Sequence, residues 1–200
     1  MPGGPLTDPL DYPWTDGLIL AAAGRRTGRA VVSVGCNAAP FVLREKLARH
    51  GVSSDVAVAS VRVDGIAVGH SAHVSVRGYI PAAPYAAPGR TAEVHVSWFD
   101  DDQLAALDAT EPNYDRITVG KVDLYVSKWG VLGVAGVPIA FTTQRRLHHV
   151  LAANGGAGGV IDSGDAVATV TRLQDAEVRE RLRQTWADGG YAVSSGLAEA

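Results

Sequence analysis

The stretch from Trp98 to Val119 reads WFDDDQLAALDATEPNYDRITV and predicts a short helix followed by a strand. Asp100 is a favourable N-cap residue, and Gln103 stands three residues later, in the position of a capping box. A proline disfavours the helical conformation of the residue before it, so Pro112 ends the helix. We therefore expect a helix over residues 101–110, with the strand directly after it.

The end of this helix directs Glu111 toward the core. At about 100° per residue, Glu111 projects between Leu104 and Leu107, the two leucines that must face the core. Its carboxyl group also lies at the partially negative C-terminus of the helix, near Asp108. Burial and nearby negative charge disfavour the ionised form, so we expect a raised pKa at Glu111 and the ability to take up and return a proton. The alternative is a Glu111 that turns to solvent or pairs with Arg116.

A second feature lies earlier in the chain, where an apolar strand leads through a glycine loop into a helix. Residues 30–34, AVVSV, have the apolar and β-branched character of a buried strand. Gly35-Cys36-Asn37 interrupts this strand, and Pro40 suits the first turn of a helix that ends at Gly51. Backbone N–H groups at such a junction carry partial positive charge. The loop is therefore a candidate cradle for a carboxylate or a phosphate.

Alternating and β-branched residues predict several further strands. Asp64-Gly65 is a strong two-residue turn signal, so we expect a hairpin between DVAVASVRV and IAVGHSAHVSV. Residues 81–90, PAAPYAAPGR, predict a proline-rich loop. A second hairpin is expected at Gly120-Lys121, between ITV and VDLYV.

Two helices close the predicted fold, one after a Thr143 cap and one after an Asp175 cap, with a glycine-rich loop at residues 154–167 between them. The order of strands and helices is not a regular βαβ alternation. It predicts an α+β fold with a mixed, mainly antiparallel sheet, closed into a small β-barrel with surrounding helices. We expect a single domain over residues 29–200, preceded by an irregular, proline-rich N-terminal arm over residues 1–28.

Within the arm we expect one helical turn at Leu18–Ala23, and Tyr12 and Trp14 are the residues able to anchor the arm to the domain. The net charge of −3 and the lack of a basic run argue against nucleic-acid binding. The N-terminus lacks the basic and apolar regions of a secretory signal, and the apolar runs are too short to span a bilayer. We therefore expect a cytoplasmic protein that binds neither nucleic acid nor membrane.

The single cysteine and the histidines offer alternative chemistries. A helix N-terminus can lower the pKa of a thiol, so Cys36 is a candidate nucleophile with a histidine as its base, although a lone cysteine more often packs in the core. His70 and His73 are three apart on a predicted strand and face opposite sides. His148 and His149 also diverge on their helix, so we expect no metal site.

Two segments carry a resemblance to the gamma-glutamylcyclotransferase-like family. VVSVGCNAAPFVLREKL resembles the opening strand and "YGSN" loop of that family, with Val34-Gly35-Cys36-Asn37 at the motif. DDQLAALDATEPNYDRITV is similar to the segment in which a helix delivers the family's catalytic glutamate ahead of a "Y.R..V" strand, here Tyr114, Arg116 and Val119. The two motifs occur in the family's order, and the resemblance covers about residues 31–132.

The resemblance implies a cofactor-free enzyme of lyase or acyltransferase type with a small-molecule γ-glutamyl substrate. The substrate's own α-amine attacks its γ-carbonyl, releasing 5-oxoproline and an amine or amino acid. Glu111 is the implied general acid/base, and no metal or other cofactor is implied. The candidate substrate-binding residues are Val34, Gly35, Cys36, Asn37, Tyr114 and Tyr125. Three residues are second-line candidates for lining or supporting the pocket: Tyr114, Arg116 and Tyr125.

The chain departs from the family motif at two positions, since Val34 replaces the tyrosine and Cys36 replaces the serine. The first change removes a hydroxyl group and an aromatic wall near the substrate, whereas the backbone donors remain. A rival hypothesis follows, in which the fold serves as a noncatalytic module that binds a small molecule or a partner. In that case Glu111 would pair with Arg116 or turn to solvent.

Overall fold

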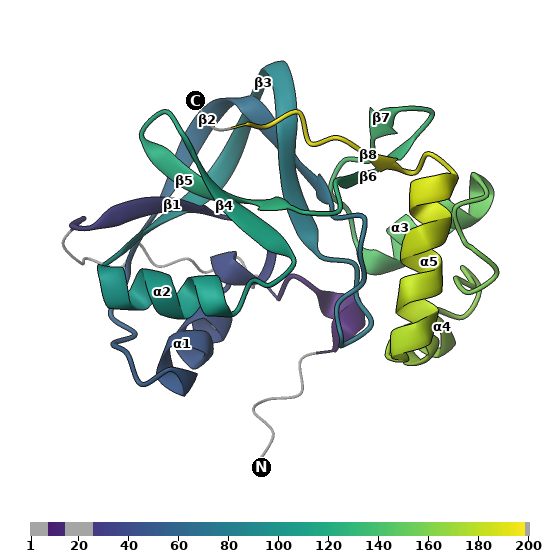
Figure 1. The fold of residues 1–200 in the computed structure, drawn as a ribbon, viewed down its shortest axis with the longest axis horizontal. Helices are drawn as coiled ribbons and strands as arrows, with labels where there is room; N and C mark the ends of the chain where they lie inside the picture. The colour runs from purple at the N-terminus through teal and green to yellow at the C-terminus, as the bar shows by residue number, and fades with distance from the viewer. Residues whose placement is uncertain (1–7, 15–25, 199–200) are drawn as a thin grey trace.

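Residues 8–14 and 26–198 are described in the computed structural model of the chain. They form an α+β protein with five α-helices, a mixed five-stranded sheet and a small three-stranded sheet (Figure 1). The expected helical turn at Leu18–Ala23 lies outside the described residues. In chain order the elements are η1 (Pro9–Asp11), β1 (Arg29–Ser33), η2 (Gly35–Ala38), α1 (Pro40–Arg49), β2 (Ala57–His70), β3 (Ala82–Phe99), α2 (Asp101–Ala109), β4 (Tyr114–Val119), β5 (Val122–Ser127), β6 (Val131–Val134), β7 (Val137–Pro138), α3 (Gln144–Ala153), α4 (Ala166–Leu173), α5 (Ala176–Asp188) and β8 (Ala192–Val193).

The large sheet has the strand order β2-β3-β1-β5-β4. β1 pairs in parallel with β5, and every other named pair in this sheet is antiparallel, which confirms the mixed, mainly antiparallel prediction. The prediction of a closed barrel is wrong for the described residues, because β2 and β4 remain the two edges of the sheet. The chain after β2 bridges from Ser71 to Val131 on β6, so it continues into the small sheet β7-β6-β8 rather than pairing with β4.

The hairpin expected at Asp64-Gly65 is also wrong. β2 continues through Gly65, which has a φ of +82°, and the pairing with β3 shifts register between Asp64 and Ile66. As a result, residues 82–90 of the expected proline-rich loop belong to β3. Proline is tolerated there because β1 pairs only with residues 95–99 of β3, so the segment containing Pro84 has β2 as its sheet neighbour on one side only.

Helices α1 and α2 pack together against one face of the large sheet (Figure 1). Alternation along β1 places Val31 in the cluster beneath these helices and Val32 in the cluster on the other face. The capping box of Asp100 and Gln103 starts α2 as predicted, with each side chain bonded to the other residue's backbone N–H. The predicted hairpin between β4 and β5 is confirmed as well.

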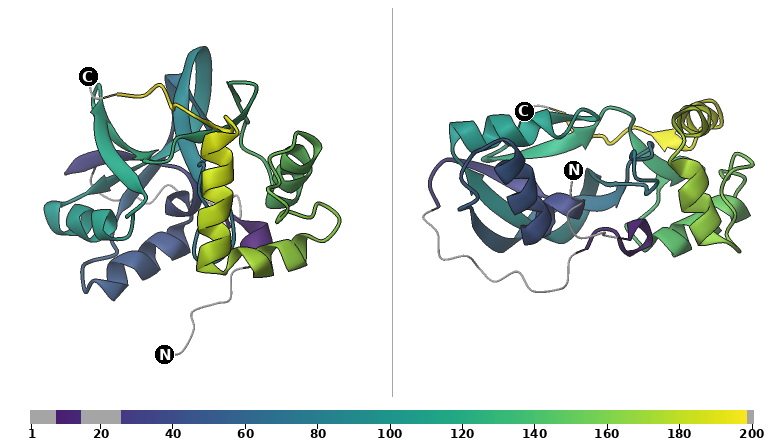
Figure 2. Two further views of the ribbon diagram at one scale, coloured as in Figure 1. Left: turned by 45° about the vertical axis from the view of Figure 1, so that its right-hand side comes forward. Right: turned by 90° about the horizontal axis from the view of Figure 1, so that it is seen from below.

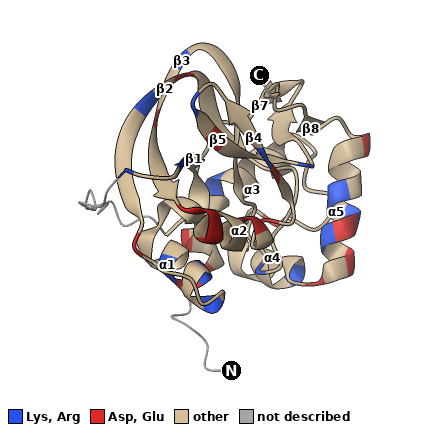
Figure 3. Ribbon diagram, turned by 60° about the vertical axis from the view of Figure 1, so that its left-hand side comes forward, with Lys and Arg blue, Asp and Glu red and all other residues tan. Residues whose placement is uncertain are grey.

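The C-terminal helices α3, α4 and α5 form a second cluster around the fully buried Trp186, beside the small sheet (Figure 2). α3 and α5 begin at their predicted caps, Thr143 and Asp175. α4 was not predicted; its cap is Asp165, inside the expected glycine-rich loop. Acidic residues lie along α2 and both signs of charge along α5 (Figure 3). In the described residues, no helix has the length and apolar character needed to cross a membrane.

Candidate active site

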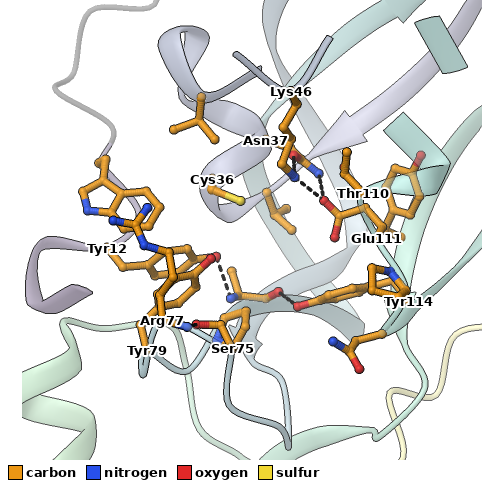
Figure 4. Close-up of a pocket in the computed structure, with 18 of the residues that line it drawn as sticks. Tyr12, Cys36, Asn37, Lys46, Ser75, Arg77, Tyr79, Thr110, Glu111 and Tyr114 are labelled. Carbon is orange, nitrogen blue, oxygen red and sulfur yellow. Dashed lines mark hydrogen bonds and ion pairs between the residues drawn. The ribbon is translucent and has the colours of Figure 1, made fainter. Parts of the chain in front are cut away.

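A cavity of about 430 Å³ opens beside η2, α1 and the end of α2 (Figure 4). Four segments that are distant in sequence meet around it: the described part of the N-terminal arm, the η2–α1 segment, residues 73–82 ahead of and at the start of β3, and the residues that follow α2. In Figure 4, Tyr12 and Glu111 lie on opposite sides of Cys36. The cavity therefore has an aromatic side supplied partly by the arm and a charged side supplied by α1 and the end of α2.

Glu111 is held on the charged side by two donors. Its Oε1 accepts hydrogen bonds from Asn37 Nδ2 at 2.9 Å and from Lys46 Nζ at 2.5 Å. Lys46 Nζ also donates to Asn37 Oδ1 at 2.7 Å, which closes a triangle of three side chains. The other carboxylate oxygen, Oε2, accepts no hydrogen bond from the described residues, and the Glu111 side chain is 11% exposed. One oxygen is thus anchored while the other is available to a bound molecule.

Arg116 is not the partner of Glu111. It donates to Asp108 through Nε at 2.9 Å and to Asp123 through Nη1 at 2.6 Å. Burial alone raises the pKa of Asp108, but hydrogen bonds from Arg116 and Tyr125 outweigh it and lower that pKa. The sequence argument for Glu111 rested on burial and nearby negative charge, and the structure adds the Lys46 ammonium in contact with the Glu111 carboxylate.

Lys46 was missed by the sequence analysis. It lies three residues after Leu43 and next to Leu47, both buried, so its position on α1 turns it toward the protein. Burial alone lowers the pKa of Lys46, but the nearby Cys36 and Glu111 raise it above its ordinary value, so it is an ammonium at neutral pH. That helical position is the signal that would have identified it.

Cys36 lines the cavity and is half-buried. Burial raises the pKa of its thiol, and the opposing effect of Lys46 does not reverse this direction. The thiol form therefore dominates at neutral pH, which is the wrong state for a nucleophile. His73 lines the same cavity, and burial lowers its pKa to about 4, so it is a neutral imidazole.

The remaining predicted residues fall on or next to the cavity. Val34, Asn37, Tyr114 and Tyr125 line it. Gly35 lies behind them at a φ of +59°, where an added Cβ would be 2.0 Å from the Tyr12 hydroxyl oxygen. Neither the N-terminus of η2 nor that of α1 is capped by a side-chain hydrogen bond.

The arm residue Tyr12 makes the closest contact with the loop. It is 4% exposed, and its hydroxyl oxygen accepts a hydrogen bond from Ala82 N at 2.8 Å. Tyr114 donates to Ala82 O at 2.9 Å, so two tyrosines that are distant in sequence bond to the backbone of the same residue. Burial raises the pKa of both tyrosines well above the ordinary value, and both keep their proton at neutral pH. The expectation that Tyr12 anchors the arm is confirmed.

Within residues 8–14 and 26–198, no group of three or more His, Cys, Asp or Glu side chains is arranged to hold a metal ion. Comparison with known proteins gives no relative: no family model, no curated protein and no solved structure matches this chain.

Proposed function

We propose that the protein is a cofactor-free enzyme of γ-glutamyl cyclotransferase type, which releases 5-oxoproline from a γ-glutamyl amine or amino acid. The observation that carries the proposal is the geometry of Glu111. One oxygen is fixed by Asn37 and Lys46, and the other is open to the cavity. A general base needs this combination, because its orientation must be fixed while one oxygen can still reach the substrate.

The reaction balances without water or a cofactor. The α-amine of the γ-glutamyl group attacks its γ-carbonyl carbon, the bond from that carbon to the leaving nitrogen breaks, and the leaving amine gains the proton that the α-amine loses. Glu111 carries this proton from one nitrogen to the other. Because the nucleophile is tethered to the carbonyl, holding the substrate in a folded conformation supplies much of the rate enhancement.

The residues expected to bind substrate would contribute in different ways. The backbone N–H groups at the start of η2, which no side chain caps, and the Lys46 ammonium suit the α-carboxylate of the substrate. An apolar part of the cavity wall comes from Val34, Tyr114 and Tyr125. Gly35 acts indirectly, by admitting Tyr12 close behind the loop.

A second candidate function is the noncatalytic binding module. The ion pair between Lys46 and Glu111 favours it, because a carboxylate whose task is to hold α1 to the end of α2 needs no reactive chemistry. In this alternative the cavity binds a small molecule and releases it unchanged.

A product assay separates the two candidates. The protein is incubated with a panel of γ-glutamyl amines and γ-glutamyl amino acids, and 5-oxoproline is followed by mass spectrometry. We expect product with the wild type and a rate at least about a hundredfold lower with Glu111→Gln, which keeps the shape but not the proton transfer. Glu177→Gln on α5, whose side chain is 89% exposed, is the matched control and should act like the wild type. Equal rates for Glu111→Gln and the wild type would refute the assignment, and binding without product across the panel would favour the binding module.

A further inference from the structure

The aromatic side of the cavity is built by the N-terminal arm together with the segment before β3. η1 is fixed by an Asp8 cap and by Leu10, which clusters with Ala166 and Val170 of α4. After this anchor, Trp14 and Tyr12 line the cavity, and Figure 4 shows Tyr12 there. The described residues 8–14 of the arm therefore contribute to the cavity wall.

Three rings form this wall in a defined arrangement. Tyr12 stacks on Tyr79, with ring centroids 4.3 Å apart and planes 16° from parallel. Trp14 stands edge-on to both tyrosines at 5.2 Å, with interplanar angles of 85°. Trp14 and Tyr79 are only half-buried, so they keep surface that a ligand can cover. We define these three residues as the aromatic wall.

The charge around the aromatic wall selects among ligands. The guanidinium carbon of Arg77 lies 5.3 Å from the centroid of the Trp14 ring, in a cation–π contact. A ligand cation would compete for the same ring face and meet a like charge. A neutral flat ring avoids both costs and pairs edge-to-face or offset with the exposed aromatic surface. The wall therefore suits an uncharged aromatic group better than a second ammonium.

From this arrangement we infer that the aromatic wall is the subsite for the leaving group, and that the substrate is the γ-glutamyl amide of an amine that carries a flat, uncharged aromatic ring. Trp14 is a specificity-determining residue in this site. The γ-glutamyl part lies on the charged side near Glu111, and the scissile bond lies between the two sides. The inference rests on the proposed cyclotransferase reaction for the identity of the leaving group, whereas the aromatic preference of the wall can be tested by binding alone.

The test compares γ-glutamyl phenethylamide with γ-glutamyl ethylamide, which lacks the ring. We expect the wild type to prefer the phenethylamide by about tenfold or more in kcat/KM. Trp14→Leu should bring this ratio close to one, and Trp14→Phe should restore most of it. Trp98→Leu is the matched control, because Trp98 is also half-buried under an arginine, Arg26 at 5.1 Å, but does not line the cavity. A ratio near one in the wild type, or a ratio that Trp14→Leu leaves unchanged, would overturn the inference.

Calorimetric binding to the Glu111→Gln variant separates failure of the inference from failure of the proposed function. If no protein turns over either amide, but the phenethylamide binds about tenfold more tightly and this advantage disappears with Trp14→Leu, the aromatic subsite stands and the cyclotransferase reaction is rejected. If both amides turn over and bind equally, the reaction stands and the aromatic leaving group is rejected.

Discussion

Replacing Gly35 with alanine tests whether the arm and the glycine loop form one unit. Two costs arise at this position. The first is the left-handed backbone conformation, at a φ of +59°, which costs a residue with a Cβ roughly 1–2 kcal/mol. The second is contact with Tyr12, whose hydroxyl oxygen would lie 2.0 Å from the new Cβ. Ordinary contacts of a Cβ begin near 3.4 Å, so the tyrosine must move by more than 1 Å.

The second cost follows from what Tyr12 loses when it moves. Its hydroxyl no longer accepts the hydrogen bond of the buried Ala82 N–H, and an unsatisfied buried donor costs about 1–3 kcal/mol. Its stacking on Tyr79 is weakened as well, at about 0.5–1.5 kcal/mol. Together these losses add about 2–4 kcal/mol to the backbone cost. The free energy of unfolding of Gly35→Ala should therefore fall by about 3–6 kcal/mol.

Gly120→Ala is the matched control, because Gly120 has a φ of +62° and open space around its Cβ position. It reports the backbone cost alone. Urea unfolding of both variants should give Gly35→Ala the larger loss by about 2–4 kcal/mol. In a Tyr12→Leu background, which removes the hydroxyl, the excess cost of Gly35→Ala over Gly120→Ala should shrink to the part that comes from the 3.0 Å approach of the new Cβ to the Ala82 Cβ. If Gly35→Ala costs no more than Gly120→Ala in the wild-type background, Tyr12 does not pack against the loop as described.

Two further predictions concern protonation. Burial lowers the pKa of three histidines, His70, His73 and His148, to about 4, below the ordinary 6.5. Between pH 4 and 6.5 the unfolded chain therefore binds more protons than the folded protein. The free energy of unfolding should fall as the pH falls through this window. Near pH 5 the free energy of unfolding should fall by up to roughly 4 kcal/mol per pH unit, and a flat profile by urea unfolding would contradict this burial. Burial also raises the pKa of Cys36, so iodoacetamide should alkylate it more slowly than free cysteine at pH 8. Alkylation should be slower still in Lys46→Met, because this change removes an ammonium group that lowers the Cys36 pKa. Alkylation at the rate of free cysteine, followed by mass spectrometry, would disprove the prediction.

Local signals were sufficient for much of the fold. The capping box at Asp100 and Gln103, the proline-terminated end of α2 and the caps of α3 and α5 depend on neighbouring residues, and each was predicted from sequence. The proximity of Glu111 to Asn37 was also anticipated, although 74 residues separate them. It was implied only by the family resemblance, which assigns both residues to one site.

Features that depend on pairing between distant segments were not predictable in this way. Asp64-Gly65 has the sequence of a hairpin turn, but pairing with β3 on both sides of Gly65 makes it an irregularity within β2. The prediction of a closed barrel was wrong for the same reason, because tertiary packing, and not local sequence, decides which strands pair at the edges of a sheet. Lys46 was read as an ordinary helix residue, because its partners come from η2 and from the end of α2.

The central claim is that the substrate's own amine, and not water, displaces the leaving group in a reaction that Glu111 serves. The most direct test is to incubate the protein with γ-glutamyl phenethylamide in ¹⁸O-labelled water and to analyse the products by mass spectrometry. Cyclisation predicts unlabelled 5-oxoproline and phenethylamine in equal amounts, formed at least about a hundredfold more slowly by Glu111→Gln. Glutamate that carries ¹⁸O would identify a hydrolase instead. The same unlabelled products at the same rate from Glu111→Gln would remove Glu111 from the reaction.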